Sequence, residues 1–451
     1  MHLRGTFVHT PRLGDLEILH DYLLVTDSSG VITHFQAASS PESQLVLHSS
    51  DLIIVPNGSF IIPNFVDLHL HAPQFLYQGN GLHLPLMQWL NEYAFKAEER
   101  LDGDPALARK VYSRLARRLI LNGTGTVLLF GTIKEDTNLI LAEVMQAFGI
   151  RAFVGKLSMD ISSRPSYVEP SAEDSLKAAQ SFITKCRDLT STFPVHERLV
   201  EPVVTPRFVP TCSDELLVGL GKLSAAEDVK IQSHLAEAHD QVEYVRNERG
   251  VEDIQVFARS GLMTTRTIQA HCTFLDPPSL QQVHSCGTAI AHCPLSNSYF
   301  SAEPFRLREA LDTGVKIGLG TDIAGGYSLD LMNAMRQAVS VSRMRQGSKI
   351  MTGAAAEKSL AIDWKESLYL ATKGGANALG LVSGVFGVGS PFDAQQICLF
   401  DSHGSGIGAL DFFDLESPGV HDHSITVEML EKWWCIGDSR IEQVYGYRAP
   451  N

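Results

Sequence analysis

The sequence predicts an α/β fold: a (β/α)8 TIM barrel with a small β-sandwich-like domain that the N- and C-terminal segments form together. Two observations support this prediction. Strand-like and helix-like runs alternate from about residue 61 to about residue 380, and eight such units are what a closed barrel requires. Both ends of the chain instead show strand character with little helical periodicity. We therefore divide the chain into residues 1–60, the barrel over 61–380, and residues 381–451.

Length and composition are consistent with this class and exclude others. The chain has 451 residues, of which 44% are hydrophobic and 20% charged, so it can bury a large core. A net charge of −14 argues against nucleic acid or an anionic membrane as the main partner. The seven cysteines are scattered without a CxxC pair, and no leader or bilayer-spanning apolar run is evident. We expect a soluble, cytoplasmic protein.

The terminal segments predict short strands separated by Gly, Ser, Pro and Asp turns. In the first 60 residues these strands cover 5–9, 22–27, 31–35 and 51–55, with a hairpin tip at residues 28–30. Beyond residue 380, strand character returns over 393–400 and 440–447. The simplest arrangement joins both ends into one small domain beside the barrel.

The barrel strands are expected to end at eight positions along the chain. These positions lie near His69, Leu129, Leu157, Thr205, His234, His271, Ala291 and Asp322. Residues 105–122, rich in Leu, Ala and Arg, predict one of the intervening helices. Another is expected after Ser171, which with Asp174 resembles a capping box.

Metal-binding side chains fall at these predicted strand ends. His69 and His71 are two residues apart and so face the same side of an extended strand. His234, His271 and Asp322 end strands five, six and eight. Barrel enzymes place their catalytic groups at this rim, and four imidazoles with one carboxylate suit zinc or ferrous iron. Each residue alone is weak evidence, but together they predict a metal centre.

The chain resembles members of the amidohydrolase superfamily along nearly its whole length. The resemblance rests on residues 63–71, 233–237, 291–297 and 318–322. It implies a metal-dependent hydrolase whose ligands are the four histidines and the aspartate named above. Some members bridge two metals with a carboxylated lysine at the end of strand four, where this chain has no lysine. One zinc ion per chain, or iron, is therefore implied, and Lys156 on strand three is expected to have a structural or supporting role.

A sharper resemblance is to the guanine deaminases. It rests on residues 71–74, 84–86 with 89–90 and Glu98, 205–208, 234–237, 320–328 and 437–445. Two departures are His271-Cys272, where His-Gly is common, and the short tail, but neither changes a proposed ligand. The resemblance implies hydrolytic deamination of guanine to xanthine and ammonia by a metal-activated water, in purine catabolism or salvage, by a homodimer.

The same resemblance suggests roles for the remaining residues. Asp322 would accept a proton from the water, and Glu237 would protonate a ring nitrogen and assist the departing ammonia. Glu237 has a plainer interpretation as a carboxylate favoured at a helix N-terminus. The substrate-binding set would line the purine on all sides. It comprises Gln74, Arg207, Phe208, His234, Glu237 and Asp322.

Several assignments stay open at this point. Trp89 either faces the purine or packs within a helix face, and Arg207 has a less favoured alternative as a surface salt bridge. His292 either makes a loop hydrogen bond or transfers a proton, and Asn297 is expected to cap a helix.

Two other functions compete with the leading one. The first is another mononuclear amidohydrolase, a deaminase or chlorohydrolase acting on a different purine, pyrimidine or triazine ring. The second is an inactive scaffold, which the complete ligand set disfavours. The compact zinc deaminases of nucleic acids are excluded because the chain lacks their PCxxC motif.

Overall fold

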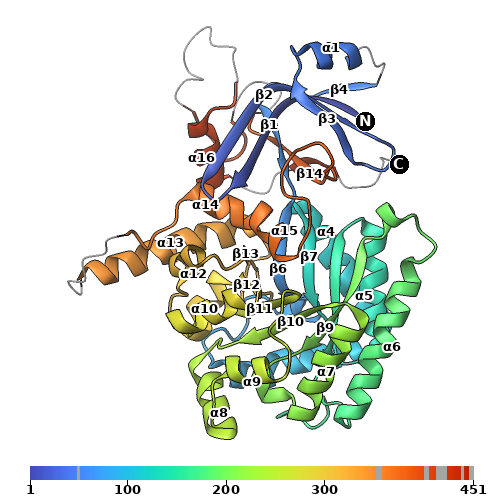
Figure 1. Cartoon of the computed structure of the whole chain (residues 1–451), viewed down its shortest axis with the longest axis vertical. Coiled ribbons are helices and arrows are strands. Elements are labelled where there is room, and N and C mark those ends of the chain that lie inside the picture. Colours follow the sequence, from blue (N-terminus) through green and yellow to red (C-terminus); the bar gives the residue numbers. More distant parts are fainter. Residues whose placement is uncertain (48–50, 352–357, 401–405, 413–423, 438–440, 446–451) are drawn as a thin grey trace.

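A computed structural model describes the chain except for residues 48–50, 352–357, 401–405, 413–423, 438–440 and 446–451 (Figure 1). Eight strands form one sheet in the order β13-β12-β11-β10-β9-β8-β7-β6, and every neighbouring pair is parallel. These strands are β6 (Phe65–His71), β7 (Thr124–Phe130), β8 (Arg151–Ser158), β9 (Val200–Pro206), β10 (Lys230–Leu235), β11 (Thr267–His271), β12 (Ala289–His292) and β13 (Ile317–Leu319). The predicted barrel is confirmed.

The two edge strands meet at the mouth of the barrel. The Asp322 amide donates to the His69 carbonyl and the His71 amide donates to the Ile323 carbonyl, each at 2.8 Å. The loop after β13 therefore completes the ring against β6. The eighth strand is shorter than expected, because β13 ends at Leu319 and leaves Asp322 in this loop.

Helices surround the parallel sheet (Figure 1). They include α4 (Pro105–Leu121), α5 (Glu135–Phe148), α6 (Ala172–Thr190), α7 (Asp214–Glu227), α8 (His239–Arg249), α9 (Asp253–Arg259), α10 (Pro277–Ser285), α12 (Leu307–Thr313) and α13 (Leu331–Met351). Two of them agree with the predictions: α4 covers the expected helix, and the Ser171 side chain caps α6 by accepting from the Asp174 amide. Apolar residues at helical spacing on α4 are buried against the barrel: Ala108, Val111, Tyr112, Leu115, Ala116 and Leu119.

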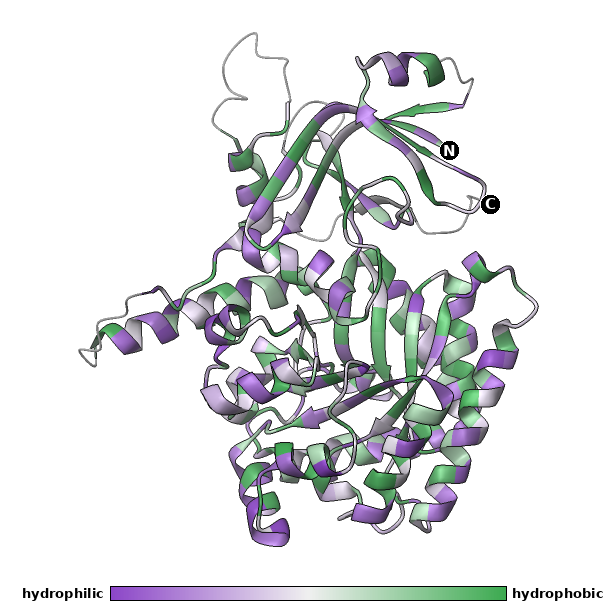
Figure 2. Ribbon diagram, viewed as in Figure 1, coloured by the Kyte–Doolittle hydropathy of each residue, from purple (hydrophilic) through white to green (hydrophobic). Residues whose placement is uncertain are grey.

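Shorter elements fill the loops between these helices. They are η1 (Ala72–Tyr77), α2 (Leu86–Trp89), η2 (Leu90–Ala94), α3 (Phe95–Asp102), η3 (Val195–Glu197), η4 (Val209–Thr211), α11 (Pro294–Ser296), η5 (Asn297–Ser301), α14 (Trp364–Tyr369), η6 (Leu370–Gly374) and α15 (Gly375–Ala378). Figure 2 shows apolar residues concentrated along the barrel strands. None of the helices in the described ranges is long and apolar enough to cross a bilayer.

Both ends of the chain meet in a second sheet, of seven strands. Its members are β1 (His2–Arg12), β2 (Asp15–Thr26), β3 (Ile32–Ala37), β4 (Leu52–Ile54), β5 (Ser59–Pro63), β14 (Ala394–Cys398) and β15 (Ile441–Tyr445). Antiparallel pairing of β14 with β5 joins the C-terminal segment to the N-terminal one, as predicted. Helices α1 (Pro41–Val46) and α16 (Val427–Ile436) accompany this sheet (Figure 1). The predicted limit at residues 60 and 61 lies within β5, and the domain limits stay a prediction.

Lys156 on β8 forms a buried ion pair with Glu169. Glu169 also accepts hydrogen bonds from the Met159 amide at 2.8 Å and the Ser175 hydroxyl at 2.6 Å. Burial lowers the pKa of Lys156, although the Glu169 carboxylate opposes that shift. The pair therefore connects β8 to the start of α6.

Replacing Lys156 by Ala is expected to destabilise the protein without affecting its metal content. The change leaves the Glu169 charge buried without its partner, which costs about 3–5 kcal/mol of unfolding free energy. Urea unfolding measures the loss, and Lys177→Ala is the matched control because the Lys177–Glu173 pair is exposed. Normal stability combined with loss of metal would show that Lys156 supports the metal centre instead.

Candidate active site

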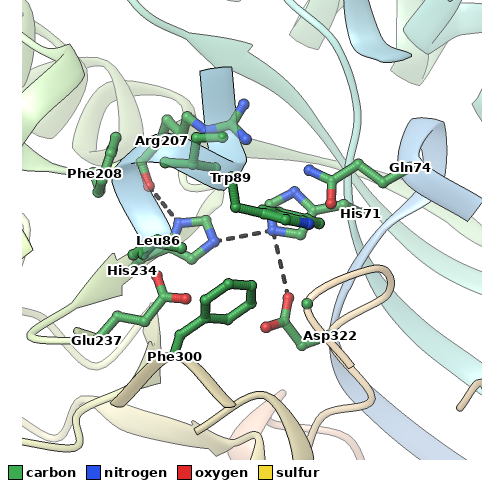
Figure 3. A pocket seen from close by; sticks show the side chains of 12 residues that line it. His71, Gln74, Leu86, Trp89, Arg207, Phe208, His234, Glu237, Phe300 and Asp322 are labelled. Carbon is green, nitrogen blue, oxygen red and sulfur yellow. Dashed lines mark hydrogen bonds and ion pairs between the residues drawn. The ribbon is translucent and has the colours of Figure 1, made fainter. Parts of the chain in front are cut away.

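The five predicted metal ligands converge at the mouth of the barrel. His71 Nε2 lies 3.0 Å from His234 Nε2, and His69 Nε2 lies 3.0 Å from Asp322 Oδ1. His271 Nε2 is 3.8 Å from Asp322 Oδ2. Figure 3 shows His71, His234 and Asp322 facing a common centre. The geometry brings together residues from both edge strands of the sheet and from strands between them, while their role as ligands stays a prediction.

The chemistry of this cluster suits a bound cation. Burial lowers the pKa of His69, His71 and His234 well below the ordinary value, so these imidazoles are neutral and keep a lone pair for a metal. The Nε2 atoms of His69 and His271 are buried and have no hydrogen-bond partner within the described part of the chain. Such orphaned nitrogens beside a carboxylate fit one divalent metal of borderline softness.

Backbone geometry and neighbouring groups aim these side chains. His271 and Asp322 have φ values of +67° and +49°, in the left-handed region that non-glycine residues rarely adopt. His234 Nδ1 donates to the Arg207 carbonyl at 2.6 Å, and His271 Nδ1 donates to Asn297 Oδ1 at 2.9 Å. With Nδ1 engaged in this way, Nε2 of each ring is directed at the centre of the cluster.

Asn297 differs from its predicted role. It was expected to cap a helix, but its side-chain oxygen accepts from His271 instead. The residues are 26 positions apart. Local sequence therefore contained no signal for this contact.

Asp67 is a site residue that the sequence reasoning missed. Its carboxylate accepts from the Thr321 amide at 3.0 Å, the Thr321 hydroxyl at 2.5 Å and the His69 amide at 3.2 Å. Burial raises the pKa of Asp67 to about 7, against these hydrogen bonds. Asp67 thus joins β6 to the loop that carries Asp322. The period-two alternation of residues 67, 69 and 71 was an available signal.

A pocket opens beside the five predicted ligands, which we call the predicted metal-ligand cluster. Its lining is His71, Gln74, Leu86, Trp89, Leu90, Arg207, Phe208, His234, Glu237, Phe300, Asp322 and Gly325 (Figure 3). Trp89 lies 5.2 Å from Phe300 between ring centroids, and its indole donates to the Asn80 carbonyl at 2.8 Å. Trp89 therefore packs within the wall and also faces the pocket. Aromatic walls of this kind suit a planar ligand.

A polar cluster lines part of this pocket. Arg207 is 1% exposed, which excludes the surface salt bridge. Its Nη1 donates to Glu98 Oε2 at 2.6 Å, and its Nη2 has no partner among the described residues. Gln74 Nε2 donates to Glu98 Oε1 at 2.9 Å, and Gln74 Oε1 accepts from the Ala324 amide at 3.2 Å. The sequence motifs include Glu98 but indicate no role for it.

Glu237 faces the pocket from the segment after β10 (Figure 3). It precedes α8, which begins at His239, so it lies outside the helix. Its Oε1 is 3.6 Å from His271 Nε2. Burial, reinforced by the charge of Asp322, raises the pKa of Glu237 well above the ordinary value. A buried carboxyl group that retains its proton is suited to act as a general acid.

His292 lies outside this pocket. It contacts Phe305 at 5.1 Å between ring centroids and lines a separate cavity with Pro294 and Arg306. Burial lowers its pKa to about 3, so the imidazole is neutral. His292 ends β12, and its buried Nδ1 has no hydrogen-bond partner among the described residues, so the structure supports neither the loop hydrogen bond nor a place in the pocket beside Glu237.

Known proteins are similar to this chain in sequence and in fold. The model of the amidohydrolase family matches residues 60–422. The chain is 37% identical to a guanine deaminase of Mus musculus over 98% of this chain and 94% of that protein. It is 30% identical to a guanine deaminase of Escherichia coli over 84% and 83% of the two chains. The crystal structure of a guanine deaminase from C. acetobutylicum with bound guanine superposes with a TM-score of 0.85, at 29% identity over 99% and 98% of the chains.

Proposed function

This chain belongs to the amidohydrolase family, and we propose that it catalyses the hydrolytic deamination of guanine to xanthine and ammonia. It is a hydrolase that acts on C–N bonds in cyclic amidines. One observation carries the proposal above all: the pocket that His71, His234 and Asp322 line is also lined by Gln74 and Arg207. The similarity to guanine deaminases over nearly the whole chain supports guanine as the substrate.

One zinc ion per chain would be held by His69, His71, His234, His271 and Asp322, and iron is the alternative. When bound, such a metal lowers the pKa of water from 15.7 to about 7 and so makes a nucleophile available at neutral pH. The neutral imidazoles and the unpartnered Nε2 atoms support this ligand set.

Two carboxyl groups that line the pocket, those of Asp322 and Glu237, carry out the proton transfers. Asp322 accepts a proton from the attacking water. Glu237, whose burial favours its protonated form, donates its proton to a ring nitrogen as the water oxygen adds to C2. Asp322 then passes the proton it took from the water to the amino group, and the C2–N bond breaks to release ammonia. The hydroxyl on C2 returns a proton to Glu237 as it becomes the carbonyl of xanthine, so both carboxyl groups regain their starting states. Water supplies the oxygen that replaces the amino nitrogen, so the atoms balance.

Gln74 and Arg207 recognise the base from the part of the pocket wall away from the reacting groups. Arg207 donates through its free Nη2 to the O6 carbonyl, and Gln74 pairs with ring atoms. A guanidinium only donates, so it favours a carbonyl over an amino group at C6. Phe208 and Trp89 contribute apolar surface, while His234, Glu237 and Asp322 line the reacting side.

An ammonia-release assay tests the proposal. Purified protein is supplied with guanine, adenine, cytosine, S-adenosylhomocysteine or a chlorotriazine, and xanthine is quantified alongside ammonia or chloride. Faster turnover of guanine than of any other ring is expected. If another ring reacts at least as fast, the mononuclear deaminase or chlorohydrolase alternative is preferred. Near-zero bound metal together with no turnover would favour the scaffold alternative.

We also propose a cytoplasmic homodimer that acts in purine catabolism or salvage. The seven cysteines are all free, which supports a reducing compartment. The dimer rests on the resemblance alone, and light scattering of the purified chain tests it.

Replacing Arg207 by Ala is expected to weaken guanine binding more than it slows turnover. The loss of a buried charged donor raises KM by roughly 10- to 100-fold. The preference for guanine over adenine should also fall. Steady-state kinetics with both bases measure the effect, and Arg207→Lys, which keeps the charge without the forked geometry, is the control. An unchanged preference in Arg207→Ala would remove this residue from base recognition.

A further inference from the structure

A buried carboxylate behind the pocket wall connects the two residues that face the purine edge. Glu98 is 0% exposed and lies on α3. Its Oε1 accepts from Gln74 and its Oε2 accepts from Arg207. We infer that Glu98 is a positioning residue that determines which base edges the site accepts, by holding the Gln74 amide and the Arg207 guanidinium in one orientation. This inference rests on the proposed function.

Helix α3 holds Arg207 from two directions. Phe95, one turn before Glu98, places its ring 4.8 Å from the Arg207 guanidinium carbon. Glu98 binds Nη1 of the same group, which leaves Nη2 to donate to a ligand. Arg207 and Gln74 both line the pocket (Figure 3), and both bind Glu98. The helix therefore determines which guanidinium donor remains available to a base.

The contacts of Gln74 are directional in the same way. A side-chain amide has nearly the same shape after a 180° flip, but the flip exchanges its donor and its acceptor. Both oxygens of Glu98 accept, so Glu98 selects the orientation of the amide with Nε2 toward α3. The Ala324 amide only donates, so it selects Oε1 on the other side. Both neighbours select the same orientation of the amide. The remaining N–H and the remaining lone pair of Gln74 therefore form a fixed donor–acceptor pattern toward a ligand.

This pattern matches one kind of base edge. A ring N–H beside a carbonyl needs an acceptor next to a donor, as an oriented amide offers. Guanine carries that arrangement at N1 and O6. A ring with an unprotonated nitrogen beside an amino group carries the reverse, as in 2,6-diaminopurine. Because 2,6-diaminopurine keeps the 2-amino group, it can still release ammonia and serves as the matched competitor.

The test compares Glu98→Gln with Glu98→Asp. The Gln variant has nearly the same shape, but it sets an amide N–H against Gln74 or Arg207, both of which donate. We expect guanine KM to rise by about 10- to 100-fold, a smaller change in kcat, and a fall of at least about tenfold in the guanine to 2,6-diaminopurine ratio of kcat/KM. Glu98→Asp keeps an acceptor-only group and should retain the preference for guanine, even where KM rises.

A double variant separates positioning from structural support. In Gln74→Glu combined with Glu98→Gln, the new amide at position 98 donates to the new carboxylate at position 74 and accepts from Arg207. The Ala324 amide keeps an acceptor. The midpoint of thermal unfolding should therefore return toward that of the wild type, whereas the guanine KM should stay high because position 74 no longer donates. Glu99→Gln, on the same helix but paired with Arg164, is the control and should keep the guanine preference.

The outcomes discriminate between the two proposals. An active wild type whose Glu98→Gln variant keeps guanine KM and selectivity would overturn this inference alone. Recovery of KM together with the unfolding midpoint in the double variant would reduce Glu98 to structural support and would also overturn it. A wild type that releases no ammonia from guanine would overturn the proposed function and this inference with it.

Discussion

Replacing Glu237 by Gln is expected to lower kcat for guanine about 1,000-fold, within the range that general acid–base groups contribute. The amide fills the same volume but cannot give a proton to the ring nitrogen or pass one to the leaving amine. Glu237 lies in the pocket, and its burial favours the protonated carboxyl group that the step requires. The effect should fall on kcat, because the proton moves in the transition state rather than on binding.

The measurement requires a metal-loaded variant. Metal content by atomic emission and xanthine affinity by calorimetry show whether the site is intact. Glu243→Gln, an exposed change on α8, should leave turnover unaltered. Near-normal turnover in Glu237→Gln with a full complement of metal would remove Glu237 from the mechanism.

Removing the metal is expected to abolish turnover and to lower the unfolding midpoint. Four histidines and Asp322 converge in a buried site. Because burial lowers the pKa of each imidazole, the histidines stay neutral, and a bound metal is needed to balance the charge of the carboxylate. A ligand that binds only the folded chain adds about 4 kcal/mol of stability when it is present at a thousandfold excess over its Kd. Dialysis against a chelator, followed by ammonia release and differential scanning calorimetry, measures both effects.

Adding metals back identifies the one that the site prefers. Zinc is expected to restore turnover and the unfolding midpoint together, at one equivalent per chain, and ferrous iron is compared under anaerobic conditions. Chelator already saturated with zinc is the control for non-specific effects. Full turnover by a chain that holds less than about a tenth of an equivalent of metal would contradict a metal-dependent reaction.

The strand pattern predicted the barrel and the convergence of the predicted metal-ligand cluster. Strand period places His69 and His71 on one face, and the parallel order of a barrel brings the ends of all strands to one rim. The place of His234, His271 and Asp322 in the cluster was predicted from their positions at or just after strand ends. The same reasoning predicted too long an eighth strand, because β13 ends at Leu319. Asp322 follows in the loop, where its left-handed φ directs the side chain into the site.

Strand and helix periodicity predicted the fold and the residues that gather at the rim, because periodicity is a property of local segments, and the resemblance of short motifs predicted the family. The tertiary structure alone decided which partners hold those residues. Glu98 reaches Gln74 across 24 residues and Arg207 across 109, and Asn297 reaches His271 across 26. A hydrogen bond between distant segments depends on how helices and loops pack around the barrel, and no local pattern encodes that packing.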